Sequence, residues 1–309
     1  MSPADKGAEG ARAALLAGVM CFVIWGLAPL AYQPMGRAGA DAWEIMAHRT
    51  LWSVILAGVL VLLAKQGAQV RRVFRDARLL GWLAASTVLI AVNWVVFVWA
   101  VNNGHTLETS LGYYLNPLLN MALGVWLFRE RLGGFGKAAI ALAAVGVALQ
   151  ALAIGQLPWV SLVLAFSFAG YGVIRKRAAV DAQAGLLVEC LLMAPFGVAW
   201  LIWLEMHGQG HFTAAPQVVA LLALAGPLTV FPLALFSWAA RRMPLSAMGF
   251  LQFIAPTISF CIGVAQGEPF NALRGVSFAF IWAGAVTFAA GAFIRNRASR
   301  KAAERTRVV

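Results

Sequence analysis

Residues 43–64 read WEIMAHRTLWSVILAGVLVLLA, a run long enough to cross a bilayer, because about 20 apolar residues span its hydrocarbon. His48 and Arg49 stand side by side about two helical turns into this run. A cationic side chain at such a depth costs from about 3 to more than 10 kcal/mol, so it normally faces protein or an aqueous cavity and has a partner. The stretch therefore predicts a membrane helix, and the rest of the chain must supply the cavity and the partner.

The composition of the whole chain is that of a polytopic membrane protein. Of its 309 residues, 61% are hydrophobic and 12% are charged, whereas about a quarter are charged in soluble domains. A net charge of +12 would suggest nucleic acid in a soluble chain, but the basic residues here stand between apolar runs, where they orient membrane helices. We therefore expect no nucleic-acid partner. The three cysteines lie inside apolar runs without metal-ligand spacing, which indicates packing residues.

Ten apolar runs of about 17 to 25 residues follow one another along the chain. We expect helices at 13–33, 43–64, 79–101, 108–128, 137–154, 158–174, 183–205, 217–239, 245–265 and 275–294. Little sequence is left for a soluble domain. The expected fold is therefore an all-α integral membrane protein with ten transmembrane helices.

Basic residues alternate between the two sides of these spans. The termini and the connections after even-numbered spans contain 21 of the 24 Lys and Arg residues. The connections after odd-numbered spans contain only Arg37 and Arg274, and Arg49 lies within a span. Because positively charged connections normally face the cytoplasm, both termini are expected on the cytoplasmic side.

Similar motifs recur in the same order in the two halves of the chain. They are FVWA at 97–100, SLGY at 110–113 and Pro117 in the first half, and FSWA at 236–239, AMGF at 247–250 and Pro256 in the second. Because each half has five spans, the second copy begins on the opposite side of the membrane. We expect two inverted five-helix repeats, 1–154 and 155–309, with a site between them.

One face of the fourth span carries polar side chains at helical spacing. They are Thr109, Tyr113, Asn116 and Asn120. Pro117 leaves a carbonyl of the preceding turn without its usual donor, so we expect a hinge or helix break there. The stripe indicates either a substrate path or hydrogen bonds that join neighbouring helices and repair the break. Gln252 and a second candidate break at Pro256 form a weaker counterpart in the ninth span, which favours the path.

Glu189 is the carboxylate that lies well inside an apolar run, about two turns from the cytoplasmic end of the seventh span. His48 and Arg49 lie about as far from the outer end of the second span, so the difference in depth argues against a direct contact with Glu189. We expect His48 and Arg49 to bind or gate a substrate and Glu189 to carry a coupling proton. The alternative is that all three are structural. Asn93 and Trp94 of the third span are further candidates for the pathway.

Five motifs resemble those of one transporter family. They are FVIWGLAP at 22–29, AHR at 47–49, NWVVFVWAVNN at 93–103, ETSLGYYLNPLLN at 108–120 and GFLQFIAPT at 249–257. With the ten spans, they resemble the RarD-type branch of the EamA-like transporters, in the drug/metabolite transporter superfamily. The resemblance covers essentially the whole chain and implies a multi-pass exporter in the bacterial inner membrane. One departure is Arg129–Glu130, where the related pattern has Gly-Glu, as at Gly267–Glu268.

These features predict a secondary transporter that moves a small organic metabolite or drug by alternating access, with protons as the candidate coupling ion. The sequence contains no nucleotide-binding loop, metal-spaced Cys/His cluster or hydrolase motif. We therefore expect neither an enzyme nor a cofactor or metal. The alternatives are a channel-like or facilitative permease without ion coupling and, with less support, an integral membrane enzyme. A carrier is slow and saturable, whereas a channel shows ungated conductance.

Overall fold

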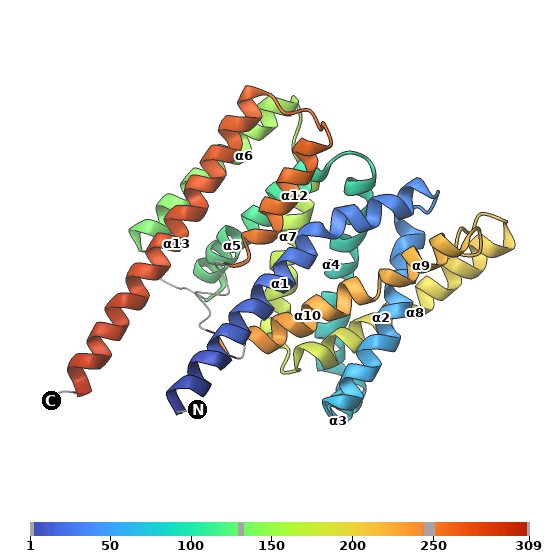
Figure 1. Cartoon of the computed structure of the whole chain (residues 1–309), viewed down its shortest axis with the longest axis horizontal. Helices are drawn as coiled ribbons and strands as arrows, with labels where there is room; N and C mark the ends of the chain where they lie inside the picture. Colours follow the sequence, from blue (N-terminus) through green and yellow to red (C-terminus); the bar gives the residue numbers. More distant parts are fainter. Residues whose placement is uncertain (1–2, 129–132, 241, 244–250, 308–309) are drawn as a thin grey trace.

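The computed structural model describes residues 3–128, 133–240, 242–243 and 251–307. These ranges contain α-helices and short links and no strand (Figure 1), which confirms the expected all-helical class. Within them, seven helical segments are long and apolar enough to cross a membrane. They are Arg12–Arg37, Ala42–Leu63, Ala77–Asn102, Gly134–Ile154, Ala182–Met206, Pro216–Ala239 and Ala272–Gly291. The chain is therefore a multi-pass membrane protein.

The described helices overlap all ten expected spans, but α1 and α13 extend well beyond the expected bounds toward the chain ends. They are α1 (Pro3–Arg37), α2 (Ala42–Leu63), α3 (Gly67–Arg75), α4 (Ala77–Asn102), α5 (Thr106–Phe128), α6 (Gly134–Ile154), α7 (Trp159–Arg177), α8 (Ala182–Met206), α9 (Pro216–Leu224), α10 (Pro227–Ala240), α12 (Ile254–Ala265) and α13 (Ala272–Arg307). Helices α5 and α7 coincide with two further expected spans, and α12 with the second half of another. Residues 129–132 and 244–250, which include Arg129–Glu130 and the start of the expected span 245–265, lie outside the described part. The total of ten spans stays a prediction.

The expected span at 217–239 is interrupted in the structure, where α9 ends at Leu224 and α10 begins at Pro227. Proline starts a helix readily because it has no N–H to donate to the preceding turn. A Cβ on Gly226 would overlap the side chain of Trp52 and approach its backbone and that of Ser53. Glycine at this position therefore lets the chain bend in direct contact with α2.

Helix α3 was not predicted. It lies in the basic connection after the second expected span, where Val73 is buried and Arg71 and Arg72 are exposed. Phe74, on the same helix, is 48% exposed. An amphipathic helix with basic residues on its polar side is typical of the membrane surface. Figure 1 shows α3 at the same end of the molecule as both termini.

The helices pack in pairs that correspond between the two halves. Helix α6 packs along α13, α2 along α8 and α5 along α12, so each of these six helices contacts the one that the predicted repeat pairs with it (Figure 1). The contact of α4 with α7 corresponds to the contact of α10 with α1. In the same way, the contact of α5 with α7 corresponds to that of α12 with α1. Exchanging the two halves of the chain converts these contacts into one another. The predicted repeat would give such a pattern, and the repeat itself stays a prediction.

Candidate functional site

Arg49 lies in α2, is 7% exposed, and contacts three other helices. Its Nε donates a 2.7 Å hydrogen bond to Oγ1 of Thr229 in α10. Its guanidinium carbon lies 3.9 Å from the ring centre of Trp94 in α4 and 5.7 Å from that of Tyr32 in α1. A desolvated cation over an aromatic face is stabilised by about 2 kcal/mol. The partners that this buried charge requires are therefore a hydroxyl and two aromatic rings.

The guanidinium of Arg49 has N–H donors that its hydrogen bond to Thr229 does not use. An arginine has five N–H donors, and the bond to Thr229 uses the one on Nε. No hydrogen bond from Nη1 or Nη2 of Arg49 occurs among the described residues. Such a pair of nitrogens is the group that holds a carboxylate or phosphate in bidentate geometry. The site can therefore accept an anionic or carbonyl oxygen beside the face of Trp94.

Tyr113 of α5 lies close to Arg49 and links it to Asn93 of α4. The Tyr113 hydroxyl donates to Oδ1 of Asn93 at 3.3 Å and lies near enough to Arg49 for an electrostatic interaction. Nδ2 of Asn93 donates to the carbonyl oxygen of Leu164 at 2.9 Å and to Oγ of Ser167 at 3.0 Å, both in α7. The structure thus brings together four of the predicted site residues. They are Arg49, Asn93, Trp94 and Tyr113.

His48 has different neighbours from Arg49, as expected for adjacent residues on a helix. Its ring stacks on Phe212 with the centroids 4.5 Å apart and the planes 19° from parallel. Phe212 belongs to the link between α8 and α9. The buried Nε2 of His48 has no hydrogen-bond partner among the described residues. His48 therefore borders the α8–α9 link and stays a candidate for gating.

The polar stripe of α5 has more than one role. The hydroxyl of Thr109 donates to the carbonyl oxygen of Thr106 in its own helix at 2.8 Å, so it neither joins a neighbouring helix nor repairs the break at Pro117. Asn116 is buried, and its Oδ1 has no partner among the described residues. Pro117 and Asn120 lie within α5, and their side chains are outside the described part. The path interpretation therefore stands on Tyr113 and Asn116.

Helix α12 meets α5 through two hydroxyl contacts. Oγ of Ser110 donates to the carbonyl oxygen of Pro256 at 2.7 Å, and the hydroxyls of Tyr114 and Thr257 lie 2.6 Å apart. Pro256 stands in the first turn of α12, where a missing N–H costs no helical hydrogen bond. Gln252 precedes this helix and is half-buried. The hinge roles of Pro117 and Pro256 stay predictions.

Glu189 of α8 is fully buried and has partners on two other helices. Oγ of Ser86 in α4 donates to its Oε1 at 2.6 Å, and the hydroxyl of Tyr171 in α7 donates to its Oε2 at 3.3 Å. Nε of Arg175 lies 3.8 Å from Oε1. Arg175, which the charge pattern assigned to a connection, lies in the last turn of α7. The ion pair of Glu189 is therefore with Arg175 rather than with Arg49.

The surroundings of Arg49 and Glu189 correspond helix by helix. Asp41 precedes α2 and Asp181 precedes α8, so both charged residues stand at the same position of their helices. Each also contacts a tyrosine and a smaller hydroxyl from corresponding helices. The Arg49 cluster comprises Tyr32 of α1, Trp94 of α4 and Thr229 of α10, and the Glu189 cluster comprises Ser86 of α4, Tyr171 and Arg175 of α7.

Five members of these clusters were not predicted from the sequence. They are Tyr32, Ser86, Tyr171, Arg175 and Thr229. The two tyrosines lie in the corresponding helices α1 and α7, but they are one residue out of register when Asp41 is aligned with Asp181, so the repeat gives only a weak signal for them. The hydroxyls of Ser86 and Thr229 carried none, because small hydroxyl residues are common throughout membrane helices.

A separate set of contacts joins helix ends on the side opposite the termini. The carboxylate of Glu268 accepts from the backbone nitrogens of Thr106 at 2.6 Å and Leu107 at 2.8 Å. The carboxylate of Glu44 accepts from the backbone nitrogen of His211 at 2.7 Å and lies 2.8 Å from its Nδ1. A carboxylate at the start of α5 satisfies free N–H groups and complements the helix dipole. We call these two interactions the outer contacts.

Comparisons with known proteins agree with a transporter. Residues 12–152 match the EamA-like transporter family. An uncharacterized transporter of Pseudomonas aeruginosa is 43% identical over 274 residues, which cover 88% of this chain and 91% of that protein. Protein RarD of Escherichia coli is 38% identical over 296 residues, covering 95% and 99%. A protein of P. aeruginosa named chloramphenicol-sensitive protein RarD is 32% identical over 247 residues, covering 78% and 82%.

The fold is also found in solved structures. One crystal structure, of a protein 19% identical to this chain, covers 89% of this chain and 94% of its own with a TM-score of 0.59. At that identity the similarity shows the fold alone. The relatives above, in contrast, match at more than 30% identity over most of their length. The chain therefore belongs to the EamA-like transporter family, together with the RarD proteins.

Proposed function

We propose that this protein is a secondary carrier of the bacterial inner membrane that exports a small organic molecule by alternating access. The moving parts are two inverted five-helix repeats, residues 1–154 and 155–309. The observation that carries the proposal is the helix-by-helix correspondence between the Arg49 cluster and the Glu189 cluster. Inverted repeats place related sites at opposite depths on either side of a common cavity.

The packing of the helices supports the inverted repeat. The self-paired contacts of α2 with α8, α5 with α12 and α6 with α13 are those of helices that straddle a pseudo-two-fold axis. Because each repeat has an odd number of spans, the two repeats have opposite orientations, and the axis that relates them lies in the membrane plane. Both chain ends and the basic helix α3 lie at one end of the molecule (Figure 1), which supports cytoplasmic termini by the positive-inside rule.

The Arg49 cluster supports a substrate with a carbonyl or anionic oxygen next to a planar or apolar group. The two terminal nitrogens of Arg49 would hold the oxygen, since a buried cation binds such a group strongly. The ring of Trp94 would cover the planar part, and Tyr113 and Asn93 would orient the remaining polar groups. Arg49 is buried in this conformation, so substrate would enter only when one side opens.

The Glu189 cluster supports proton coupling. A carboxylate buried in a membrane protein and partnered by hydroxyls is a suitable proton carrier, because the gain or loss of its proton changes the local charge by one unit. Arg175 would stabilise the ionised form, and the hydroxyls of Ser86 and Tyr171 would stay hydrogen-bonded to either form. Release of the proton would strengthen the pairing with Arg175 and hold α7 against α8.

Flux measurements in proteoliposomes test the proposal. Purified protein is reconstituted and presented with a panel of small carboxylates, amides and aromatic compounds, each with and without an imposed proton gradient. Chloramphenicol belongs in the panel because it appears in the name of one relative. We expect saturable flux of at least one compound that increases with the gradient. An absence of saturable flux across the panel would count against a carrier, and ungated conductance in planar bilayers would favour a channel.

The outer contacts give a prediction about opening. Alternating access requires the links on this side to separate, so the carboxylate of Glu268 must release the first turn of α5. Removal of a side chain that caps a helix costs about 1 kcal/mol. In Glu268→Ala the population open on this side is therefore expected to rise about fivefold.

A single cysteine at Thr109, which is buried one turn below these contacts, reports the open population. With the three native cysteines replaced by alanine, its labelling rate with a membrane-impermeant maleimide should rise about fivefold in Glu268→Ala. Glu205→Ala is the matched control, since Glu205 is an exposed carboxylate near the same end. Equal labelling rates in the two variants would show that the Glu268 contact does not hold this side closed.

A further inference from the structure

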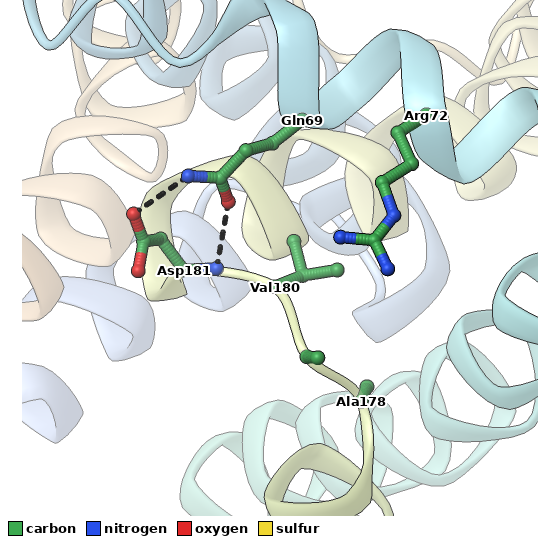
Figure 2. Close-up of a pocket in the computed structure, with 6 residues that line it drawn as sticks. Gln69, Arg72, Ala178, Val180 and Asp181 are labelled. Carbon is green, nitrogen blue, oxygen red and sulfur yellow. Dashed lines mark hydrogen bonds between the residues drawn. The ribbon is translucent and has the colours of Figure 1, made fainter.

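Two neighbouring pockets lie beside α3, at the end of the molecule that carries both termini. The first has a volume of about 470 Å³ and lies between α3 and the link that joins α7 to α8 (Figure 2). The second has a volume of about 450 Å³ and extends to the start of α4 and the end of α7. Arg72 and Ala179 line both pockets. The two pockets therefore adjoin each other, and together we call them the α3 recess.

The lining of the α3 recess is basic. Arg72, Arg78 and Arg177 contribute to the second pocket. Its carboxylate, Asp76, accepts from the backbone nitrogens of Arg78 and Leu79 at 3.0 Å and so caps α4. Because one oxygen of Asp76 is engaged at the helix end, the carboxylate is less available to pair with the neighbouring guanidinium groups. The second pocket thus carries a net positive charge.

The carboxylate of the first pocket is also engaged by neutral groups. Oδ2 of Asp181 accepts from Nε2 of Gln69 at 2.8 Å and from Nε2 of Gln66 at 3.2 Å. The backbone nitrogen of Asp181 donates to Oε1 of Gln69 at 3.1 Å. Figure 2 shows the two bonds between Gln69 and Asp181, and the guanidinium of Arg72 on the other side of Val180, pointing toward the link. Asp181 therefore fixes the link to α3 and leaves Arg72 unpaired.

Two of the arginines have guanidinium N–H donors that are free to bind a ligand. Arg72 and Arg78 are exposed, and neither guanidinium makes a hydrogen bond or an ion pair among the described residues. Arginine presents planar pairs of N–H donors that match the oxygens of a phosphate. A recess lined by two such groups is complementary to a phosphate.

The surroundings of the α3 recess place it at the level of lipid headgroups. Trp82, which lines the second pocket, lies with its ring centre 5.9 Å from the guanidinium carbon of Arg177. Tryptophan is enriched where the hydrocarbon meets the headgroups. Phe74 of α3 is 48% exposed, which suits a helix whose apolar side enters the acyl boundary. These features favour a phosphate that is attached to a lipid.

We propose that the α3 recess binds the phosphate of one anionic phospholipid. Arg72 and Arg78 hold the phosphate oxygens, and Trp82 contacts the upper part of an acyl chain. The site is remote from the Arg49 cluster and does not rest on the transport mechanism. It requires only that the protein reside in a bilayer.

Native mass spectrometry of the purified protein in a neutral detergent tests this proposal. The protein is titrated with phosphatidylglycerol, phosphatidylcholine, glycerol 3-phosphate and inorganic phosphate. We expect one phosphatidylglycerol to bind at least about tenfold more tightly than phosphatidylcholine. The two soluble phosphates should bind more weakly still, because they lack the acyl chain. Equal affinity for glycerol 3-phosphate or inorganic phosphate would overturn the lipid assignment and leave a site for a soluble anion.

A matched pair of variants separates the site from general charge. Each basic side chain near an anionic lipid contributes about fivefold, so Arg72→Gln with Arg78→Gln should weaken phosphatidylglycerol binding about 30-fold. Arg71→Gln with Arg75→Gln removes the same charge from exposed residues outside the recess lining and should change binding less than threefold. Equal losses in the two double variants, or unchanged binding in the first, would overturn the proposal. If the first double variant fails to fold, Arg78→Gln alone should show a fivefold loss.

Discussion

Replacement of Arg49 by alanine is expected to reduce transport at least about 100-fold while the protein still inserts into the membrane. The variant removes the donors proposed to hold the substrate oxygen, and a hydrogen bond to a charged group is worth about 1.5–3 kcal/mol. It also removes the cation from the faces of Trp94 and Tyr32. A loss of about 2.8 kcal/mol corresponds to 100-fold. Flux in proteoliposomes, with the panel compound that wild-type protein carries fastest, gives the measurement.

Two milder variants distinguish substrate binding from structural support. Arg49→Lys keeps the charge and loses the planar pair of donors, so transport should fall about tenfold with the Michaelis constant raised. Thr229→Val removes the hydroxyl that accepts from Nε and leaves the terminal nitrogens of Arg49 in place. Its transport should stay within about threefold of wild type. If Arg49→Ala transports normally, or if Thr229→Val loses as much as Arg49→Ala, Arg49 is not the group that binds substrate.

The burial of Arg49 was predictable from the sequence, and its partners were not. The cost of a charge in hydrocarbon is large enough to require a protein environment wherever the helix ends are placed. The identity of that environment depends on how helices pack. Thr229 lies 180 residues further along the chain, and no local pattern encodes that contact.

Helix α3 and the break between α9 and α10 depart from the expected helices for physical reasons. Helix α3 is nine residues long and mixes arginines with apolar residues, so a search for long apolar runs passes over it. The break between α9 and α10 falls in a run that is apolar throughout, so hydropathy does not reveal it. Gly226 allows the close contact at the break, because Trp52 of α2 occupies the place that a side chain on this residue would take.

The position of Arg175 shows where the charge pattern misleads. Counting basic residues at helix ends predicts orientation, but it treats each of them as solvated. A side chain on Gly185 would overlap the guanidinium of Arg175. Because Gly185 has no side chain, the Arg175 side chain can lie against α8 and reach Glu189, one turn deeper in the helix.

Glu189→Gln is expected to abolish gradient-driven accumulation and to preserve exchange of substrate across the membrane. Glutamine keeps an acceptor for the 2.6 Å hydrogen bond from Ser86 and cannot lose or gain a proton in the physiological range. Alanine would be a poorer test, because it also removes the acceptors of the hydrogen bonds from Ser86 and Tyr171, and a buried donor left without a partner costs about 1–3 kcal/mol. Accumulation and counterflow are measured on the same proteoliposomes, with a proton gradient imposed only for the first.

The control for Glu189→Gln is Asp181→Asn, which neutralises a carboxylate two turns away at the start of the same helix. Asparagine retains an oxygen that accepts from Gln69, so accumulation and exchange should both persist. Loss of both activities in Glu189→Gln would assign a structural role to the Glu189 cluster, and unchanged accumulation would remove Glu189 from the coupling mechanism. Loss of accumulation alone would identify Glu189 as the proton site, because substrate translocation then continues while its link to the gradient is broken. The Arg49 variants act on substrate binding and Glu189→Gln acts on coupling. We therefore expect the Arg49 variants to lose transport itself, and Glu189→Gln to lose only the accumulation driven by the proton gradient.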